Sequence, residues 1–183
     1  MKLRGFVSKT KKLIHESFFK LFNTQGFEKT TIKDITEHAQ IGRKTFYLHY
    51  LDKYDLLDSI VNNKFEELAI ICESKKDLGL REGTKIWFDY FEDNKSFFNQ
   101  LFNIQNANKY KNQLQKFIVT ELDKKIDKEY ILRRKLDYTL FLQFLASGII
   151  ELISIYLTEK NCQKESVEEQ VVYLIKMFSS KLS

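Results

Sequence analysis

Residues 31–53 read TIKDITEHAQIGRKTFYLHYLDK, and this stretch decides the fold. Thr31 and Asp34 have the three-residue spacing of a capping box, which marks the start of a helix. Ile32, Ile35 and Ala39 then fall on one helical face. The stretch therefore predicts a first short helix with a defined start and a buried side.

Residues 40–42 break this pattern and predict a tight turn. Gly42 is suited to cap a second helix that runs from Arg43 to His49 or Tyr50. Two short helices around a tight turn, the second one basic and aromatic, predict a helix-turn-helix. The alternative is a helical hairpin with a solvated basic face.

At these residues the chain resembles the TetR family of bacterial transcription regulators. The matching residues are Thr31, Asp34, Ile35, Ala39, Ile41, Thr45, Phe46, Tyr47, His49, Tyr50 and Lys53. Two residues depart from the family pattern, since Gln40 stands where the family usually has Gly and Gly42 where it usually has Ser. The resemblance is strong over about the first sixty residues.

The second half also resembles a known type. Its D/E-N-K-x-F-F motif, common among TetR relatives of low-GC Gram-positive bacteria, is present as Asp93, Asn94, Lys95, Phe97 and Phe98. The resemblance implies a helix-turn-helix DNA-binding domain in residues 1–52 and a helical effector-binding and dimerisation domain in residues 53–183.

Composition favours an all-α protein, because the 183-residue chain has no proline and only six glycines. We expect about nine helices, three of them in the DNA-binding domain. The ranges expected to be helical are 8–24, the two helices of the helix-turn-helix, 51 or 52 to 72, 86–91, 94–104, 108–127, 131–157 and 166–178. A loop is expected over residues 73–83.

Charge is unevenly distributed along the chain. Residues 1–53 contain eleven Lys or Arg and five Asp or Glu, whereas the remainder contains nineteen and twenty. A basic surplus on one small domain is the electrostatic footprint of a polyanion binder. An anionic membrane surface would fit the charge too, but no polybasic cluster adjoins an exposed amphipathic helix.

We expect a cytoplasmic, nucleoid-associated protein with two free thiols, since the N-terminus lacks the apolar core of a signal peptide. The segment Tyr138–Leu157 is long enough to span a bilayer but carries Gln143 and Glu151. We therefore expect a buried soluble helix and no membrane partner.

No metal-ligand spacing and no catalytic motif occurs, so we expect neither an enzyme nor a cofactor. The expected partner is a double-stranded DNA operator, contacted by the second helix of the helix-turn-helix in the major groove. By the resemblance, Arg43, Lys44, Thr45 and Leu48 contact bases, whereas Thr31, Tyr47, His49 and Lys53 contact the DNA backbone.

A homodimer is expected because helix 131–157 has apolar residues on more faces than one neighbour can cover. The predicted interface residues are Leu145, Ile149, Leu152, Ile153, Tyr156, Val171, Ile175 and Phe178. The alternative is that this helix is buried within one protomer.

The aromatic residues of the second half suggest a pocket for a small apolar effector. The predicted lining residues are Trp87, Tyr90, Phe91, Phe98, Phe102 and Phe117. The alternative is ordinary core packing, which aromatic residues at helical spacing provide more often.

The leading interpretation is a ligand-responsive repressor that binds a palindromic operator as a homodimer. One alternative is a TetR-like co-regulator or interaction protein without its own operator, against which the basic residues of the second helix argue. Another alternative is a nucleoid-binding structural protein, which would bind specific and non-specific DNA almost equally.

Overall fold

The computed structural model describes residues 9–75, 77–159 and 161–177, and these form ten α-helices. No strand occurs within these ranges, so the predicted all-α class is confirmed. Contacts between residues divide the chain into two compact units, Met1–Lys64 and Phe65–Ser183. The division of function at residue 52 stays a prediction, because compactness alone does not test it.

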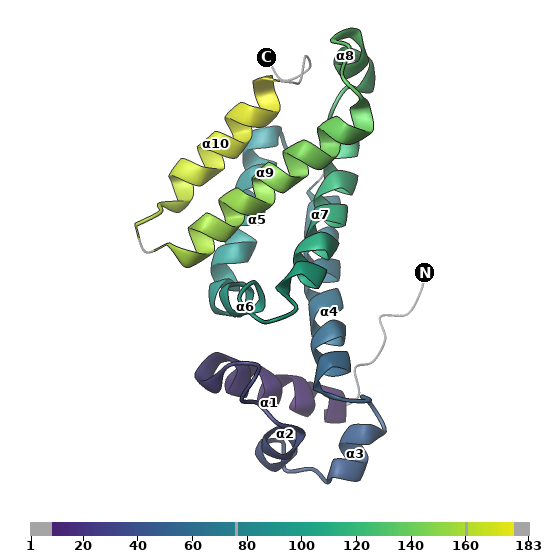
Figure 1. The fold of residues 1–183 in the computed structure, drawn as a ribbon, viewed down its shortest axis with the longest axis vertical. Coiled ribbons are helices and arrows are strands. Elements are labelled where there is room, and N and C mark those ends of the chain that lie inside the picture. Colours follow the sequence, from purple (N-terminus) through teal and green to yellow (C-terminus); the bar gives the residue numbers. More distant parts are fainter. Residues whose placement is uncertain (1–8, 76, 160, 178–183) are drawn as a thin grey trace. The chain divides into compact units, whose positions relative to one another are not determined.

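The first unit contains α1 (Lys9–Gln25), α2 (Ile32–His38), α3 (Arg43–Tyr47) and the start of α4 (Lys53–Ser74) (Figure 1). Apolar side chains from all four helices meet in one core, which explains how helices as short as α2 and α3 are held in place. The fully buried core residues include Ile14, Phe18, Phe22, Ile35, Phe46, Leu56 and Leu57.

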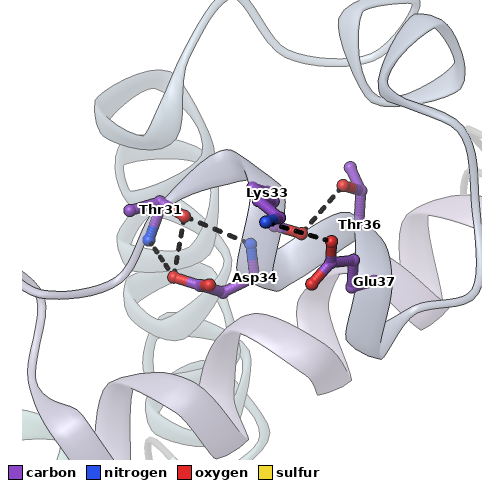
Figure 2. A network of polar contacts seen from close by, with 5 residues as sticks. All are labelled: Thr31, Lys33, Asp34, Thr36 and Glu37. Atoms are coloured by element: carbon purple, nitrogen blue, oxygen red, sulfur yellow. Dashed lines mark hydrogen bonds and ion pairs between the residues drawn. The ribbon is translucent and has the colours of Figure 1, made fainter.

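The ends of these helices follow the sequence pattern closely. Thr31 and Asp34 form the predicted capping box, in which the Asp34 amide donates to Thr31 Oγ1 and the Thr31 amide donates to Asp34 Oδ2 (Figure 2). Asp52 accepts hydrogen bonds from the amides of Tyr54 and Asp55, as a cap of α4 should. Gly26, just beyond α1, has a φ of 81°, which favours glycine.

The second unit contains the rest of α4 and six further helices (Figure 1). They are α5 (Leu80–Asp93), α6 (Lys95–Leu101), α7 (Ala107–Asp123), α8 (Lys128–Arg133), α9 (Tyr138–Thr158) and α10 (Lys164–Met177). Helix α9 packs against α5, α6, α7 and α10, and α10 also packs against α5. Helix α9 is thus the central element of this unit.

The single helix predicted over residues 131–157 is wrong, because the structure has two helices there. Lys135 adopts a φ of 60°, which ends α8, and Asp137 caps α9 by accepting from the Leu140 amide. Helix α5 also begins at Leu80, six residues before the prediction. At the other end of the chain, α10 begins at Lys164, and the predicted final residue Phe178 lies outside the described residues.

By length and apolar composition, α9 is able to cross a membrane. However, 56% of its most apolar window is buried against other parts of the protein. This is the behaviour of a core helix, since a spanning helix would present most of that surface to lipid.

The turn between α2 and α3 contains a strained residue. Gln40 has a φ of 53°, a conformation that costs a residue with a Cβ about 1–2 kcal/mol. This is the position where Gly is usual in the resembled family. The structure therefore explains that preference and identifies Gln40 as a local cost to stability.

Gln40→Gly should raise the free energy of unfolding by about 0.5–1 kcal/mol, because removing the strain outweighs the greater chain entropy of glycine. Urea denaturation followed by circular dichroism measures the change. Gly26→Ala, at a left-handed glycine of the same unit, is the matched reverse substitution and should lower stability. A less stable Gln40→Gly variant would contradict the assignment of strain.

Candidate DNA-binding site

Helix α3 presents a basic surface to solvent. Arg43 and Lys44 are exposed, and among the described residues neither side chain has an ion pair or a hydrogen bond. Gly42 caps α3 without contributing a side-chain hydrogen bond. The guanidinium group of Arg43 and the ammonium group of Lys44 are therefore suited to phosphate oxygens and to the acceptor edges of guanine.

The end of α3 adds aromatic and apolar groups to this surface. Tyr47 is exposed, His49 is half-buried and Leu48 is 81% exposed. Leu51 is also 81% exposed, although the sequence pattern assigned it to the following helix. The structure therefore adds Leu51 to the candidate surface, and no sequence signal separated it from the buried leucines of α4.

Two polar contacts hold α2 and α3 against α1. His38 Nδ1 lies 3.0 Å from Ser17 Oγ, and His15 Nε2 lies 2.7 Å from the Tyr50 hydroxyl. Burial, and secondly the charge of Lys11, lowers the pKa of His15. The neutral imidazole is therefore the form that braces the segment following α3.

Lys53 has a different role from the one predicted. Its Nζ donates to the backbone carbonyls of Phe27, Glu28 and Thr30 at 3.0, 3.2 and 3.1 Å. The ammonium also lies 4.5 Å from the centroid of the Phe27 ring. An ammonium has three donors, so these carbonyls occupy all of them, and we remove Lys53 from the phosphate-contact set.

Thr31 is similarly engaged within the protein. Its amide and its hydroxyl both donate to Asp34 Oδ2, at 2.9 and 2.7 Å (Figure 2). These hydrogen bonds lower the pKa of the Asp34 carboxyl. Thr31 has no donor left for a phosphate, so its role in this geometry is to cap α2. The candidate DNA-contact residues that remain are Arg43, Lys44, Thr45, Tyr47, Leu48 and His49, and their contacts stay a prediction.

The predicted effector residues do not line one cavity. Phe91 and Phe98 are fully buried with ring centroids 4.7 Å apart, and Tyr90 and Phe102 are also buried. Phe117 contacts the rings of Phe65 and Trp87. Of the six residues, only Trp87 lines the pocket that α4, α5, α7 and α10 form in this unit. The other rings provide core packing.

The predicted dimer residues are mostly buried within the protomer, and the interface itself stays a prediction. The residues buried there are Leu145, Ile149, Ile153, Tyr156, Val171 and Ile175. Leu152 is half-buried, and Phe178 lies outside the described residues. The periodicity identified apolar positions correctly, but neighbouring helices of the same chain cover most of them.

No group of three or more potential metal ligands occurs within the described ranges. The free thiols of Cys72 and Cys162 are both half-buried.

Comparison with known proteins identifies relatives of the first unit. Residues 17–60 match the family model of bacterial regulatory proteins of the tetR family. The curated HTH-type dhaKLM operon transcriptional activator DhaS of Lactococcus lactis is 28% identical over 93 residues. That alignment covers 51% of this chain and 49% of DhaS, so it spans about half of the relative.

Solved structures match almost the whole chain. The dihydroxyacetone kinase operon activator DhaS superposes with a TM-score of 0.69 at 23% identity, covering 94% of this chain and 99% of that one. A TetR regulator from Streptococcus agalactiae gives 0.70 at 23% identity, covering 92% and 94%. At this level of identity these matches establish the shared fold.

Lys53→Met should lower the free energy of unfolding by about 2 kcal/mol, because three carbonyls lose a charged donor. It should leave unchanged the slope of log affinity for DNA against log salt concentration. Lys44→Ala should leave stability unchanged, because its exposed side chain has no partner among the described residues, and should weaken DNA binding. Urea denaturation and salt titrations of DNA binding measure both quantities. Normal stability with a reduced slope in Lys53→Met would restore Lys53 as a phosphate contact.

Proposed function

Because residues 17–60 match the family model of bacterial regulatory proteins of the tetR family, we propose that the chain is a TetR-family regulator. In this proposal it is a ligand-responsive repressor that binds a palindromic operator as a homodimer. The observation that carries the proposal is the pair Arg43 and Lys44 on α3, both exposed and without a partner in the part of the chain that the structure describes. A helix of this width fits the major groove of B-DNA. Such a protein works in the cytoplasm, where the operator lies.

The contacts divide between bases and backbone. Arg43, Lys44 and Thr45 stand at the start of α3, the end that approaches base edges in helix-turn-helix proteins. Tyr47 and His49 are assigned to phosphates. The exposed Leu48 side chain is assigned to a thymine methyl group.

A palindromic operator requires two copies of α3 related by a twofold axis. Outward-facing apolar side chains on α9 and α10 support a homodimer, because a monomer would leave them in water. They are Leu140, Phe144, Tyr173 and Met177, all more than 60% exposed. We propose these four residues as the centre of the interface in place of the buried set.

Regulation follows from two conformers with different affinities for the operator. Helix α4 contains both Lys53 and Cys72. Lys53 binds the α1–α2 loop, and Cys72 lines the pocket in the second unit. A ligand that favours the weakly binding conformer by about 3 kcal/mol would lower operator affinity more than a hundredfold. The relative DhaS is described as an activator. Measuring transcription from a promoter with and without the operator decides whether this chain represses or activates.

Genomic fragments retained by the purified protein should share one palindromic sequence. Lys44→Ala should relax base preference within it, because a base contact is lost. Lys20→Ala, an exposed lysine of α1, removes the same charge away from α3 and is the matched control. Sequencing of retained fragments and competition with random DNA measure specificity.

The same experiment separates the alternatives. A nucleoid-binding structural protein would retain fragments without a common sequence and would bind operator and random DNA within a few fold of each other. A co-regulator without its own operator would retain none. Identical specificity in Lys44→Ala and the parent would exclude α3 as the reading helix.

Phe144→Glu should convert the dimer to a folded monomer, because it places a charge in the seam without disturbing the protomer core. Ile149→Glu, five residues later but fully buried, should instead unfold the second unit. Light scattering and circular dichroism distinguish the two results. A dimer that survives Phe144→Glu would move the interface elsewhere.

A further inference from the structure

A pocket of about 340 Å³ lies where four helices of the second unit converge. Cys72 and Glu73 of α4 form one side, and the first turns of α5 with Trp87 form another. Glu121 and Leu122 of α7 and Val171 of α10 complete the wall. The volume is at the lower end of the range of about 300–1,000 Å³ for small-molecule sites.

The wall of this pocket has two zones. The buried and half-buried part of the wall is mostly apolar, with Thr84 as a buried polar residue, and its apolar members are Leu80, Ile86, Trp87, Leu122, Val171 and Ile175. Its rim is charged and carries Glu73, Lys75, Asp77, Glu121, Lys124 and Lys125. An apolar interior with a charged rim suits an amphipathic molecule, whose body leaves water while its head stays at the opening.

The charges on the rim are equal in number but not equally available. Glu121, the one buried member, is paired with Lys124 at 2.6 Å. Lys75 and Lys125 are exposed and have no ion pair with any residue that the structure describes. Glu73 is also exposed, and its charge acts on Lys124. The two ammonium groups without an ion pair, those of Lys75 and Lys125, therefore remain with one carboxylate, Asp77, that also lacks an ion pair within the described ranges. The rim therefore favours a negative head group.

We propose that this pocket binds a small amphipathic anion, with an apolar chain or ring in the interior and an acidic head between Lys75 and Lys125. Its role as the effector of the regulator rests on the proposed function. Binding itself does not, because the pocket lies within the second unit.

Two reporters stand on the pocket wall. Trp87 is the only tryptophan of the chain, and its Nε1 donates to Cys72 Sγ at 3.0 Å. Burial raises the pKa of the Cys72 thiol, so the protonated thiol reacts slowly with thiol reagents at neutral pH. An occupant changes the surroundings of the indole and shields this thiol further.

Decanoate, decanol and decylamine have the same apolar chain and differ in the charge of the head. Titration of the full chain with each, followed by Trp87 fluorescence, should give affinities that decrease in that order, with decanoate at least tenfold tighter than decylamine. Equal affinities or a preference for decylamine would overturn the acidic head group. Binding of none of the three would overturn the pocket as an amphiphile site.

Two sets of variants test the two zones separately. The Lys75→Gln, Lys125→Gln double variant alters only exposed side chains and should lose the preference for decanoate while keeping decanol binding. Gly83 lines the pocket, and a Cβ built there meets no atom within 4 Å. Gly83→Phe should fill the interior and weaken all binding at least tenfold, whereas Gly83→Ala is its matched control.

A chemical measurement checks the location. In a Cys162→Ser background, decanoate should slow the reaction of Cys72 with a thiol reagent, and Gly83→Phe should abolish this protection. An unchanged rate with bound decanoate would place the ligand elsewhere and overturn the assignment.

Operator binding is measured separately, with and without decanoate. If bound decanoate does not change specific DNA binding, the proposed ligand site and the proposed regulator both stand, but the effector role is excluded. If the protein binds decanoate but no operator is found for it, the proposed function is excluded and the proposed ligand site stands.

Discussion

Helix α3 has only five residues, and a helix of that length does not persist alone in water. Its shape therefore depends on what surrounds it. Phe46 fixes it to the core, and the His15–Tyr50 contact holds the segment that follows. Lys53 then joins the start of α4 to the loop between α1 and α2 through three carbonyls. The candidate DNA-binding surface is thus held in place by several contacts on its buried side.

This dependence explains which residues contact the solvent and which hold the unit together. The family pattern contains both kinds and does not distinguish them. Thr31 and Lys53 are polar, near the basic helix and suited to phosphate by chemistry alone, yet their donors are used inside the protein. Arg43 and Lys44 have the same chemistry, and within residues 9–75, 77–159 and 161–177 their side chains have no such partners.

Much of the first unit could be predicted from sequence because its signals are local. The Thr31–Asp34 box, the Asp52 cap and Gly26 each act within a few residues. The break between α8 and α9 was missed because Lys135 adopts a conformation that its side chain does not favour. The covered face of α9 was also missed, since periodicity identifies apolar positions but not which neighbour covers them. The Lys53 contacts join residues more than twenty positions apart and have no local signature.

Leu48 and Leu51 remain largely in water in the free protein. The hydration of such exposed apolar side chains contributes to the heat capacity of the unbound state. Where DNA covers them, that hydration is released, and the heat capacity of the system falls. Temperature would then change how the binding free energy divides between enthalpy and entropy, although the charges of Arg43 and Lys44 stay the same.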